Sequence, residues 1–277
     1  MFSGKAIYQP VGKAGEYAKW ACNFYVGCSN DCDYCYCKKG ALGTVAGKKK
    51  ATLKKCFKDV AHAFECFVNE VTRNAGVIRS DGGLFFSFTT DPCLPETMDL
   101  TMLAVSFATG MGIPCHILTK CAWWGQDNPV YDTLVSLKTC VSVGFTLTGM
   151  DSMETGRTIS TNKERLALMK RLHDDGVKTF SSFEPIIDIA AAKEIFLQSL
   201  GVCDLYKFGL LSGKKDYDMQ QLNALIADVN FLFSEKKIPV YWKRSIEEFI
   251  GASIVGSNVV DKNFKLITSL IGSGEVD

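Results

Sequence analysis

Four cysteines fall within eleven residues near the start of the sequence, in the segment GCSNDCDYCYC at 27–37. Three of them, Cys28, Cys32 and Cys35, have the spacing C-x3-C-x2-C. Thiols this close together can bind zinc, form disulfides, hold an iron–sulfur cluster or stay free. Structural zinc usually takes two separated cysteine pairs, or cysteines with histidines, and the three histidines lie elsewhere. Three thiolates in one tight loop instead suit three corners of a [4Fe–4S] cube, which leaves one iron open to a small ligand.

The remaining nine cysteines are expected to play other parts. Cys37 lies only two residues after Cys35. So short a step back toward a cube is awkward, and we expect Cys37 not to be a ligand. The other eight are scattered, mostly within apolar stretches, where free cysteine behaves as a small buried hydrophobe. They are Cys22, Cys56, Cys66, Cys93, Cys115, Cys121, Cys140 and Cys203.

The elements that must position these residues alternate between strand and helix patterns. Strands are predicted at 20–27, 83–91, 113–120, 140–148, 177–185, 203–211 and 238–244. Helices are predicted at 53–76, 96–109, 161–176, 190–201 and 217–236, with a further one that begins at Asn128 and Pro129. Such alternation implies a parallel sheet with right-handed crossovers. Six or seven units are too few for a closed eight-stranded barrel, so a partial barrel or an open doubly wound sheet is expected.

Several boundaries carry their own local signals. Thr161 and Glu164 form a capping box that starts one helix, and Gly76 is a predicted helix stop. The segment GALGTVAGKKK at 40–50 is expected to be a flexible, solvated loop. No low-complexity segment or linker divides the chain.

Polar residues cluster where the predicted strands end, which is where parallel α/β proteins place their active sites. The cysteine loop at 27–37 follows the first strand and therefore opens onto the same rim. We expect these side chains to lie near one another. They are Thr89, Thr90, Asp91, Lys120, Thr146, Thr148, Glu184, Lys207, Lys243 and Arg244.

Composition limits the classes of function. The 277 residues are 47% hydrophobic and 22% charged, with a net charge of +1, so the chain has no overall basic character for a duplex nucleic-acid surface. There is no apolar run of 18 residues and no apolar signal segment at the start, so we expect a cytoplasmic protein without a membrane partner. Twelve cysteines in such a compartment argue against a disulfide framework.

The cysteine motif after a first strand resembles that of the radical S-adenosylmethionine (radical SAM) family, in which an aromatic residue such as Tyr34 precedes the third cysteine. The longer segment IYQPVGKAGEYAKWACNFYVGCSNDCDYCY is similar to the start of the spore photoproduct lyase-like branch. TTDPCLPET at 89–97, ILTK at 117–120 and the ERL of 164–166 also look like segments of that branch. The resemblance covers about residues 5–190.

The resemblance implies a partial (β/α)6-type TIM barrel with the cluster loop after its first strand, and two cofactors, a [4Fe–4S] cluster and S-adenosylmethionine. Reductive cleavage of S-adenosylmethionine would give a 5′-deoxyadenosyl radical that takes hydrogen from a substrate. The cluster ligands would be Cys28, Cys32 and Cys35. The cofactor-binding residues would be Tyr34, Thr90, Asp91, Lys120 and Thr146. Glu96 belongs to the same segment as Asp91.

The match breaks at two positions. Lyases of this branch carry a hydrogen-donor cysteine where this chain has Phe88. Cys93 and Cys121 lie near the same rim, so we consider both as hydrogen donors; without a donor, the substrate radical would recover hydrogen from 5′-deoxyadenosine in an isomerase-like reaction. Glu184 stands where the branch usually has apolar residues, and we expect it to pair with a ribose hydroxyl, a substrate amine or Lys207.

The expected function is therefore a radical SAM enzyme acting on a nucleic-acid base or a nucleotide-like molecule. A peptide or small-metabolite substrate, and a non-catalytic zinc or iron–sulfur protein, are the alternatives. The resemblance also implies an electron donor such as a flavodoxin or ferredoxin. We expect a single domain over 1–277, with the barrel core at about 15–210 and a C-terminal βα extension at about 211–277.

Overall fold

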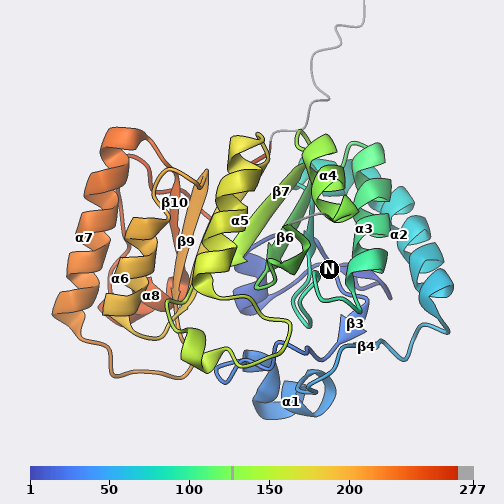
Figure 1. Cartoon of the computed structure of the whole chain (residues 1–277), viewed down its shortest axis with the longest axis horizontal. Helices are drawn as coiled ribbons and strands as arrows, with labels where there is room; N and C mark the ends of the chain where they lie inside the picture. The colour runs from blue at the N-terminus through green and yellow to red at the C-terminus, as the bar shows by residue number, and fades with distance from the viewer. Residues whose placement is uncertain (126–127, 268–277) are drawn as a thin grey trace, which may run out of the picture.

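The computed structural model describes residues 1–125 and 128–267, and its main element is one curved sheet of eight strands (Figure 1). The strand order is β1-β2-β5-β6-β7-β8-β9-β10. β1 is antiparallel to β2, and each later neighbour pair is parallel. The strands are β1 (Ile7–Tyr8), β2 (Ala21–Cys22), β5 (Leu84–Phe86), β6 (Cys115–Thr119), β7 (Val141–Thr146), β8 (Lys178–Ile186), β9 (Leu205–Leu210) and β10 (Val240–Trp242). A separate hairpin pairs β3 (Tyr25–Val26) with β4 (Thr52–Leu53).

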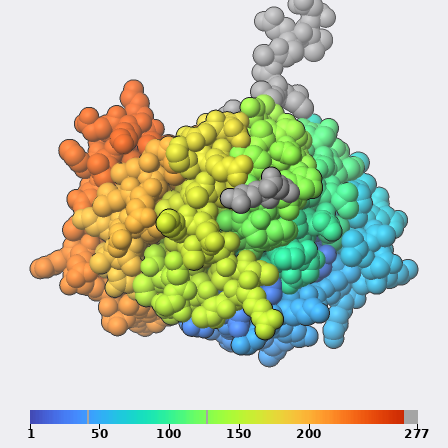
Figure 2. Space-filling model, in the orientation of Figure 1, coloured from blue at the N-terminus to red at the C-terminus, as the bar shows by residue number. Residues whose placement is uncertain are grey.

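Helices connect the parallel strands on the outer face of the sheet, as Figure 1 shows. The connecting helices are α2 (Val60–Ser80), α3 (Met98–Gly110), α4 (Pro129–Ser136), α5 (Asn162–Asp174), α6 (Ile189–Gln198) and α7 (Met219–Lys236). Two short helices lie outside this series: α1 (Gly40–Ala46) follows the cysteine loop, and α8 (Arg244–Ile250) follows β10. Short 3-10 turns lie at Gly12–Glu16, Tyr36–Lys38, Trp123–Gly125 and Asp151–Met153. Figure 2 shows the helical face as a continuous surface from α7 at one end to α2 at the other.

The parallel strands follow one another across the sheet in chain order, which is the order of a barrel wall and not of a doubly wound sheet. Six helical crossovers, α2 to α7, join β2, β5, β6, β7, β8, β9 and β10. The predicted partial (β/α)6-type barrel is confirmed. Of the expected C-terminal extension, β10 continues the same wall through its pairing with β9, and residues 268–277 lie outside the described part.

The core lies between the sheet and its helices. All six residues of β7 are buried, as expected for a central parallel strand. On β8 and β9, the rings of Phe183 and Phe208 stack at 4.7 Å, and Phe196 of α6 packs edge-on against both. No helix of the described residues is long and apolar enough to cross a membrane.

Two predictions about α2, its start and its end, are wrong. The helix predicted to begin at residue 53 begins at Val60, because Leu53 lies in β4 and the Asp59 carboxylate caps the helix by accepting from the His62 N–H at 2.7 Å. Phe57 falls on the helical repeat of the sequence, but it precedes the helix and is buried against Phe24. Gly76 does not end α2; a solvent-facing glycine inside a helix costs only about 1 kcal/mol.

Other boundary signals gave mixed results. The Asn128 side chain accepts from the Val130 N–H at 2.9 Å, and the Thr161–Glu164 capping box is formed, so both predicted helix starts are confirmed. The expected loop at 40–50 is partly helical instead, as α1. The preceding 3-10 turn at Tyr36–Lys38 offers a helix nucleus, and the Gly43 N–H continues it by donating to the Lys39 carbonyl at 3.2 Å.

Candidate active site

A cavity of about 560 Å³ opens at the carboxyl ends of the parallel strands. Cys28, Cys32 and Cys35 all line it, so the structure brings the three motif cysteines to one cavity. Tyr34, Thr90, Asp91, Lys120, Thr146 and Glu184 line it as well. These predicted site residues therefore lie together at the carboxyl ends of the parallel strands, as expected.

The cysteine loop is held in place by its backbone and by one buried amide. Gly27 has φ +81°, and a Cβ there would come within 2.4 Å of the Lys50 carbonyl oxygen, so only glycine fits the entry to the loop. The Cys28 N–H donates to the Lys48 carbonyl at 2.9 Å. Asn30, almost fully buried, donates to the Asp91 carboxylate at 2.8 Å and so ties the loop to the end of β5.

The three motif thiols differ in their acidity. Burial raises the pKa of Cys28 to about 12 and also raises the pKa of Cys32, although the nearby Lys120 ammonium opposes the shift. A hydrogen bond from Cys37 lowers the pKa of Cys35 to about 6. A bound metal favours the thiolate form of each ligand, because coordination deprotonates a thiol outright.

Asp91 organises the middle of the site. Its Oδ1 accepts from the Cys93 N–H at 2.9 Å and the Thr119 hydroxyl at 2.7 Å. Its Oδ2 accepts from Asn30 and from the Lys120 N–H, both at 2.8 Å. The carboxylate thus joins the ends of β5 and β6 to the cysteine loop. With four protein donors on its two oxygens, Asp91 is arranged to position its neighbours and not to bind a cofactor directly.

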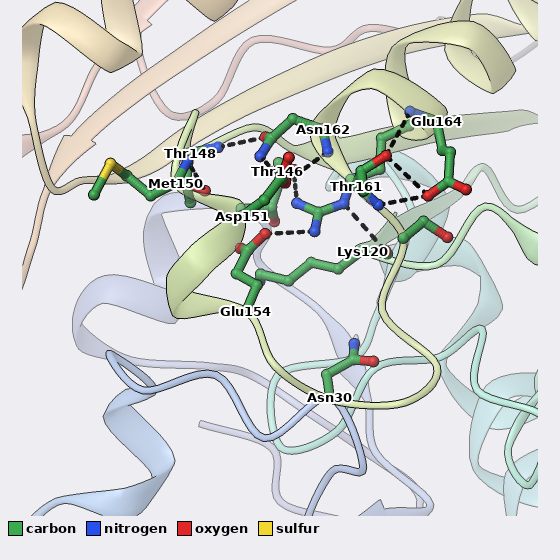
Figure 3. A network of polar contacts seen from close by, with 12 residues as sticks. Asn30, Lys120, Thr146, Thr148, Met150, Asp151, Glu154, Thr161, Asn162 and Glu164 are labelled. Atoms are coloured by element: carbon green, nitrogen blue, oxygen red, sulfur yellow. Dashed lines mark hydrogen bonds and ion pairs between the residues drawn. The ribbon is translucent and has the colours of Figure 1, made fainter.

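A buried guanidinium fixes the next two strand ends. Arg165 of α5 has no solvent exposure and donates to the Lys120 carbonyl at 3.1 Å and to the Thr146 carbonyl at 2.8 Å. Its third contact is an ion pair with Glu154 at 2.5 Å, and Glu154 also accepts from the Tyr34 hydroxyl. Figure 3 shows Glu154, Lys120 and Thr146 around this network. The network links the cysteine loop, β6 and β7.

Sequence reasoning missed Arg165 and Glu154 as site-forming residues. The available signal for Arg165 is its place in the first turn of the helix that starts at the Thr161–Glu164 capping box, and nothing in the sequence marks it as buried. Asn162, the residue that begins α5, supports the same region by accepting from the Thr148 and Gly149 N–H groups at 3.0 and 3.3 Å.

Lys120, Thr90 and Thr146 line the cavity. The Lys120 ammonium lies 5.7 Å from the centre of the Tyr34 ring. Burial lowers its pKa, but the Cys32 thiol and Glu154 outweigh that effect, so the net shift is upward. Thr146 is buried at the end of β7. The buried Thr90 hydroxyl has no hydrogen-bond partner within the described part of the chain, which leaves it available to a ligand.

The expected hydrogen donors Cys93 and Cys121 do not reach the cavity, which corrects that prediction. Both side chains belong to the hydrophobic core and are 1% and 0% exposed. Cys121 follows Lys120, which lines the cavity, but is not itself a lining residue, and its thiol donates to the Asn30 amide oxygen at 3.6 Å. Cys37 lines the cavity instead, with its thiol 3.7 Å from the Phe88 carbonyl oxygen.

Glu184 lies on the β8–β9 side of the cavity within a second buried polar cluster. Its Oε2 accepts from the Lys243 ammonium at 2.5 Å and from the Tyr17 hydroxyl at 2.7 Å. Ser182 contacts the same Tyr17 hydroxyl at 2.7 Å. The expected pairing with Lys207 is not formed. That ammonium lies 4.9 Å from the Tyr17 ring, and burial together with the Lys243 charge lowers its pKa to about 7.

The residues around the cysteine loop fit a group that takes three thiolates and leaves room for a small ligand. The three cysteines line one cavity that is large enough for a nucleoside-sized cofactor. Thr90 and Lys120 offer polar groups on the same surface. Within residues 1–125 and 128–267, no three His, Cys, Asp or Glu side chains are gathered as ligands of a single metal ion.

No family model matches the chain, and no curated protein matches it. Solved structures do resemble it. Spore photoproduct lyase complexed with a dinucleoside spore photoproduct has a TM-score of 0.49 and 14% identity over 91% of this chain and 66% of the lyase. Streptococcus suis SuiB bound to the precursor peptide SuiA has a TM-score of 0.45 and 13% identity over 66% of this chain and 44% of SuiB.

SuiB bound to S-adenosylmethionine gives a TM-score of 0.44, with 14% identity over 66% of this chain and 43% of SuiB. This chain spans about two thirds of the lyase and less than half of SuiB.

Proposed function

We propose that the protein is a radical SAM enzyme. The observation that carries the proposal is the meeting of Cys28, Cys32 and Cys35 with Lys120 on one cavity at the carboxyl ends of a parallel barrel wall. A structural metal clasp has no need of a cavity of about 560 Å³ beside it. An open cavity beside the thiols is what a cluster-bound small molecule and a substrate require.

The three cysteines would hold a [4Fe–4S] cluster, and the cavity beside them would hold S-adenosylmethionine. When bound and reduced, the two would supply a radical able to take a hydrogen atom from the substrate. Lys120 would bind the cofactor's carboxylate through its ammonium. Thr90 and Thr146 would offer hydroxyls to the same molecule, and the Tyr34 ring would flank its adenine. Asp91 and Arg165 position these groups from behind.

The substrate that we propose is a nucleic-acid base or a nucleotide-like molecule, modified in the cytoplasm with electrons from a flavodoxin or ferredoxin. Aromatic surface in the cavity supports a planar substrate, because Tyr17, which precedes β2, and Phe88, which follows β5, both line it. Aromatic side chains of this kind are the usual stacking partners of unpaired bases.

Replacement of one motif thiol tests the proposal. Cys32→Ala should remove iron binding and all production of 5′-deoxyadenosine from S-adenosylmethionine in the dithionite-reduced, reconstituted protein. Cys56→Ala is the matched control, because Cys56 is an exposed free thiol outside the cavity. We expect this control to match the wild type in both measurements. Full cofactor cleavage by Cys32→Ala would sink the proposal.

A further inference from the structure

An aromatic wall beside Glu184 can receive a flat group. Phe88 stacks on Phe85 with ring centres 4.7 Å apart and planes 4° from parallel, and Tyr17 packs against both rings. The phenol of Tyr17 is itself fixed by its hydrogen bond to Glu184. Pro185, Leu210 and Leu211 complete this part of the wall with apolar surface. Such a wall offers contact area but no preference for one edge of a planar ligand over another.

Glu184 supplies that preference. It and Asp91 are the two carboxylates that line the cavity among the described residues, and both oxygens of Asp91 are occupied by protein donors. Glu184 is different, because Lys243 and Tyr17 both donate to Oε2. Oε1 accepts no hydrogen bond from any described residue. The Glu184 side chain is 16% exposed, so a ligand can reach it.

The surroundings of Glu184 make room for this arrangement. Gly209 lies beside it on β9, and a Cβ there would come within 2.9 Å of both Oε1 and the Lys243 side chain. Lys243 has no exposure and its ammonium sits 3.5 Å from the centre of the Tyr17 ring. The carboxylate is therefore held by one oxygen while the other stays free.

On the basis of the proposed function, we propose that Glu184 Oε1 accepts a hydrogen bond from an N–H group of the substrate. The enzyme would thus select a base by its donor edge, either a ring imide N–H or an exocyclic amine. A ring that carries a methyl group in place of that hydrogen would leave Oε1 without a donor in a half-buried site. Buried polar groups left unpaired in this way are a strong source of discrimination.

Glu184→Gln should abolish the preference, because it replaces the acceptor at the Oε1 position by a donor. Because Tyr17 and Lys243 both donate to the position of Oε2, the new amide oxygen must occupy it. The amide nitrogen then takes the position of Oε1 and presents two donors to the cavity. The variant keeps the volume of the side chain and an acceptor for both partners. It also removes the charge opposite the buried Lys243 ammonium, so circular dichroism must first show that the variant is folded.

The test measures anaerobic binding of thymidine and N3-methylthymidine to the reconstituted protein with S-adenosylmethionine, by calorimetry. We expect the wild type to bind thymidine at least about tenfold more tightly, which is the usual value of a hydrogen bond to a charged group. Glu184→Gln should lose that discrimination. Glu248→Gln, an exposed glutamate outside the cavity, is the control and should keep it.

The outcomes separate this inference from the function itself. Production of 5′-deoxyadenosine by the wild type and by Glu248→Gln at the same rate without substrate would leave the enzyme class intact whichever way the binding data fall. Equal binding of the two nucleosides by the wild type would overturn the inference, as would unchanged discrimination in Glu184→Gln. The comparison of nucleosides on the wild type needs no variant, so a folding defect cannot hide the answer. Failure of every variant and the wild type to cleave S-adenosylmethionine would count against the enzyme class instead.

Discussion

Replacement of Arg165 by methionine should destabilise the protein strongly, because it removes the charge that compensates a buried carboxylate. Arg165 and Glu154 are 0% and 1% exposed, and the arginine also serves two strand-end carbonyl groups. Removal of one partner of a buried ion pair typically costs 3–5 kcal/mol. A loss of about 4 kcal/mol shifts the folding equilibrium by roughly a thousandfold, at about 1.4 kcal/mol per tenfold. A loss of that size is a large part of a typical unfolding free energy of about 5–15 kcal/mol.

The assay is urea unfolding of the metal-free protein followed by circular dichroism. Arg171→Met is the matched control on the same helix, because Arg171 is exposed and contacts the Gly125 carbonyl and the Tyr131 ring. We expect it to cost about 1 kcal/mol. Glu154→Gln combined with Arg165→Met should cost about 2 kcal/mol less than the sum of the single changes, since the double variant buries no unpaired charge. A cost below 1 kcal/mol for Arg165→Met, or strict additivity, would refute the reasoning.

Two further predictions follow from single residues. Lys120→Ala should weaken S-adenosylmethionine binding by about 10- to 100-fold, the value of a hydrogen bond to a charged group, and leave the iron content unchanged; equilibrium dialysis measures this, the exposed Lys163→Ala is the control, and unchanged binding would remove Lys120 from the site. Burial lowers the pKa of His116 to about 4, whereas the unfolded imidazole titrates near 6.5. The unfolded state therefore binds the proton first, so stability is full above about pH 6.5 and falls by about 3 kcal/mol as the pH drops through that window to 4. Unfolding at pH 7 and 4.5 checks this, and His116→Gln should have a shallower pH dependence; equal slopes would contradict it.

The order of the elements and the place of the cysteine loop could be predicted from the sequence because both depend on local patterns. Buried strands such as β7 are short apolar runs, and a parallel sheet then forces their carboxyl ends together. The same logic placed Lys120 and Thr146 on the cavity. The helical repeat gave a wrong prediction at residues 53–59, because Phe57 falls on the repeat but packs against the core from a loop.

The hydrogen-bonded partners of the site could not be predicted in the same way. Glu184 and Lys243 are 59 residues apart, and their pairing depends on the register between β8, β9 and β10. Nothing in the sequence distinguishes Lys207 from Lys243 as the partner. Cys93 and Cys121 follow strand ends, where alternation stops and the backbone can turn a side chain to either face. Their direction is set by backbone hydrogen bonds from the Cys93 N–H to Asp91 and from the Cys121 N–H to Thr119 Oγ1, which only the folded structure shows.

The most direct test of the central claim is anaerobic reconstitution of the wild-type protein with iron and sulfide, followed by reduction with dithionite and addition of S-adenosylmethionine. The account predicts about four irons per chain and the appearance of 5′-deoxyadenosine, both dependent on Cys28, Cys32 and Cys35. Binding of zinc with no cluster, and no 5′-deoxyadenosine with or without added nucleosides and DNA, would contradict it and make the cysteine loop a structural clasp.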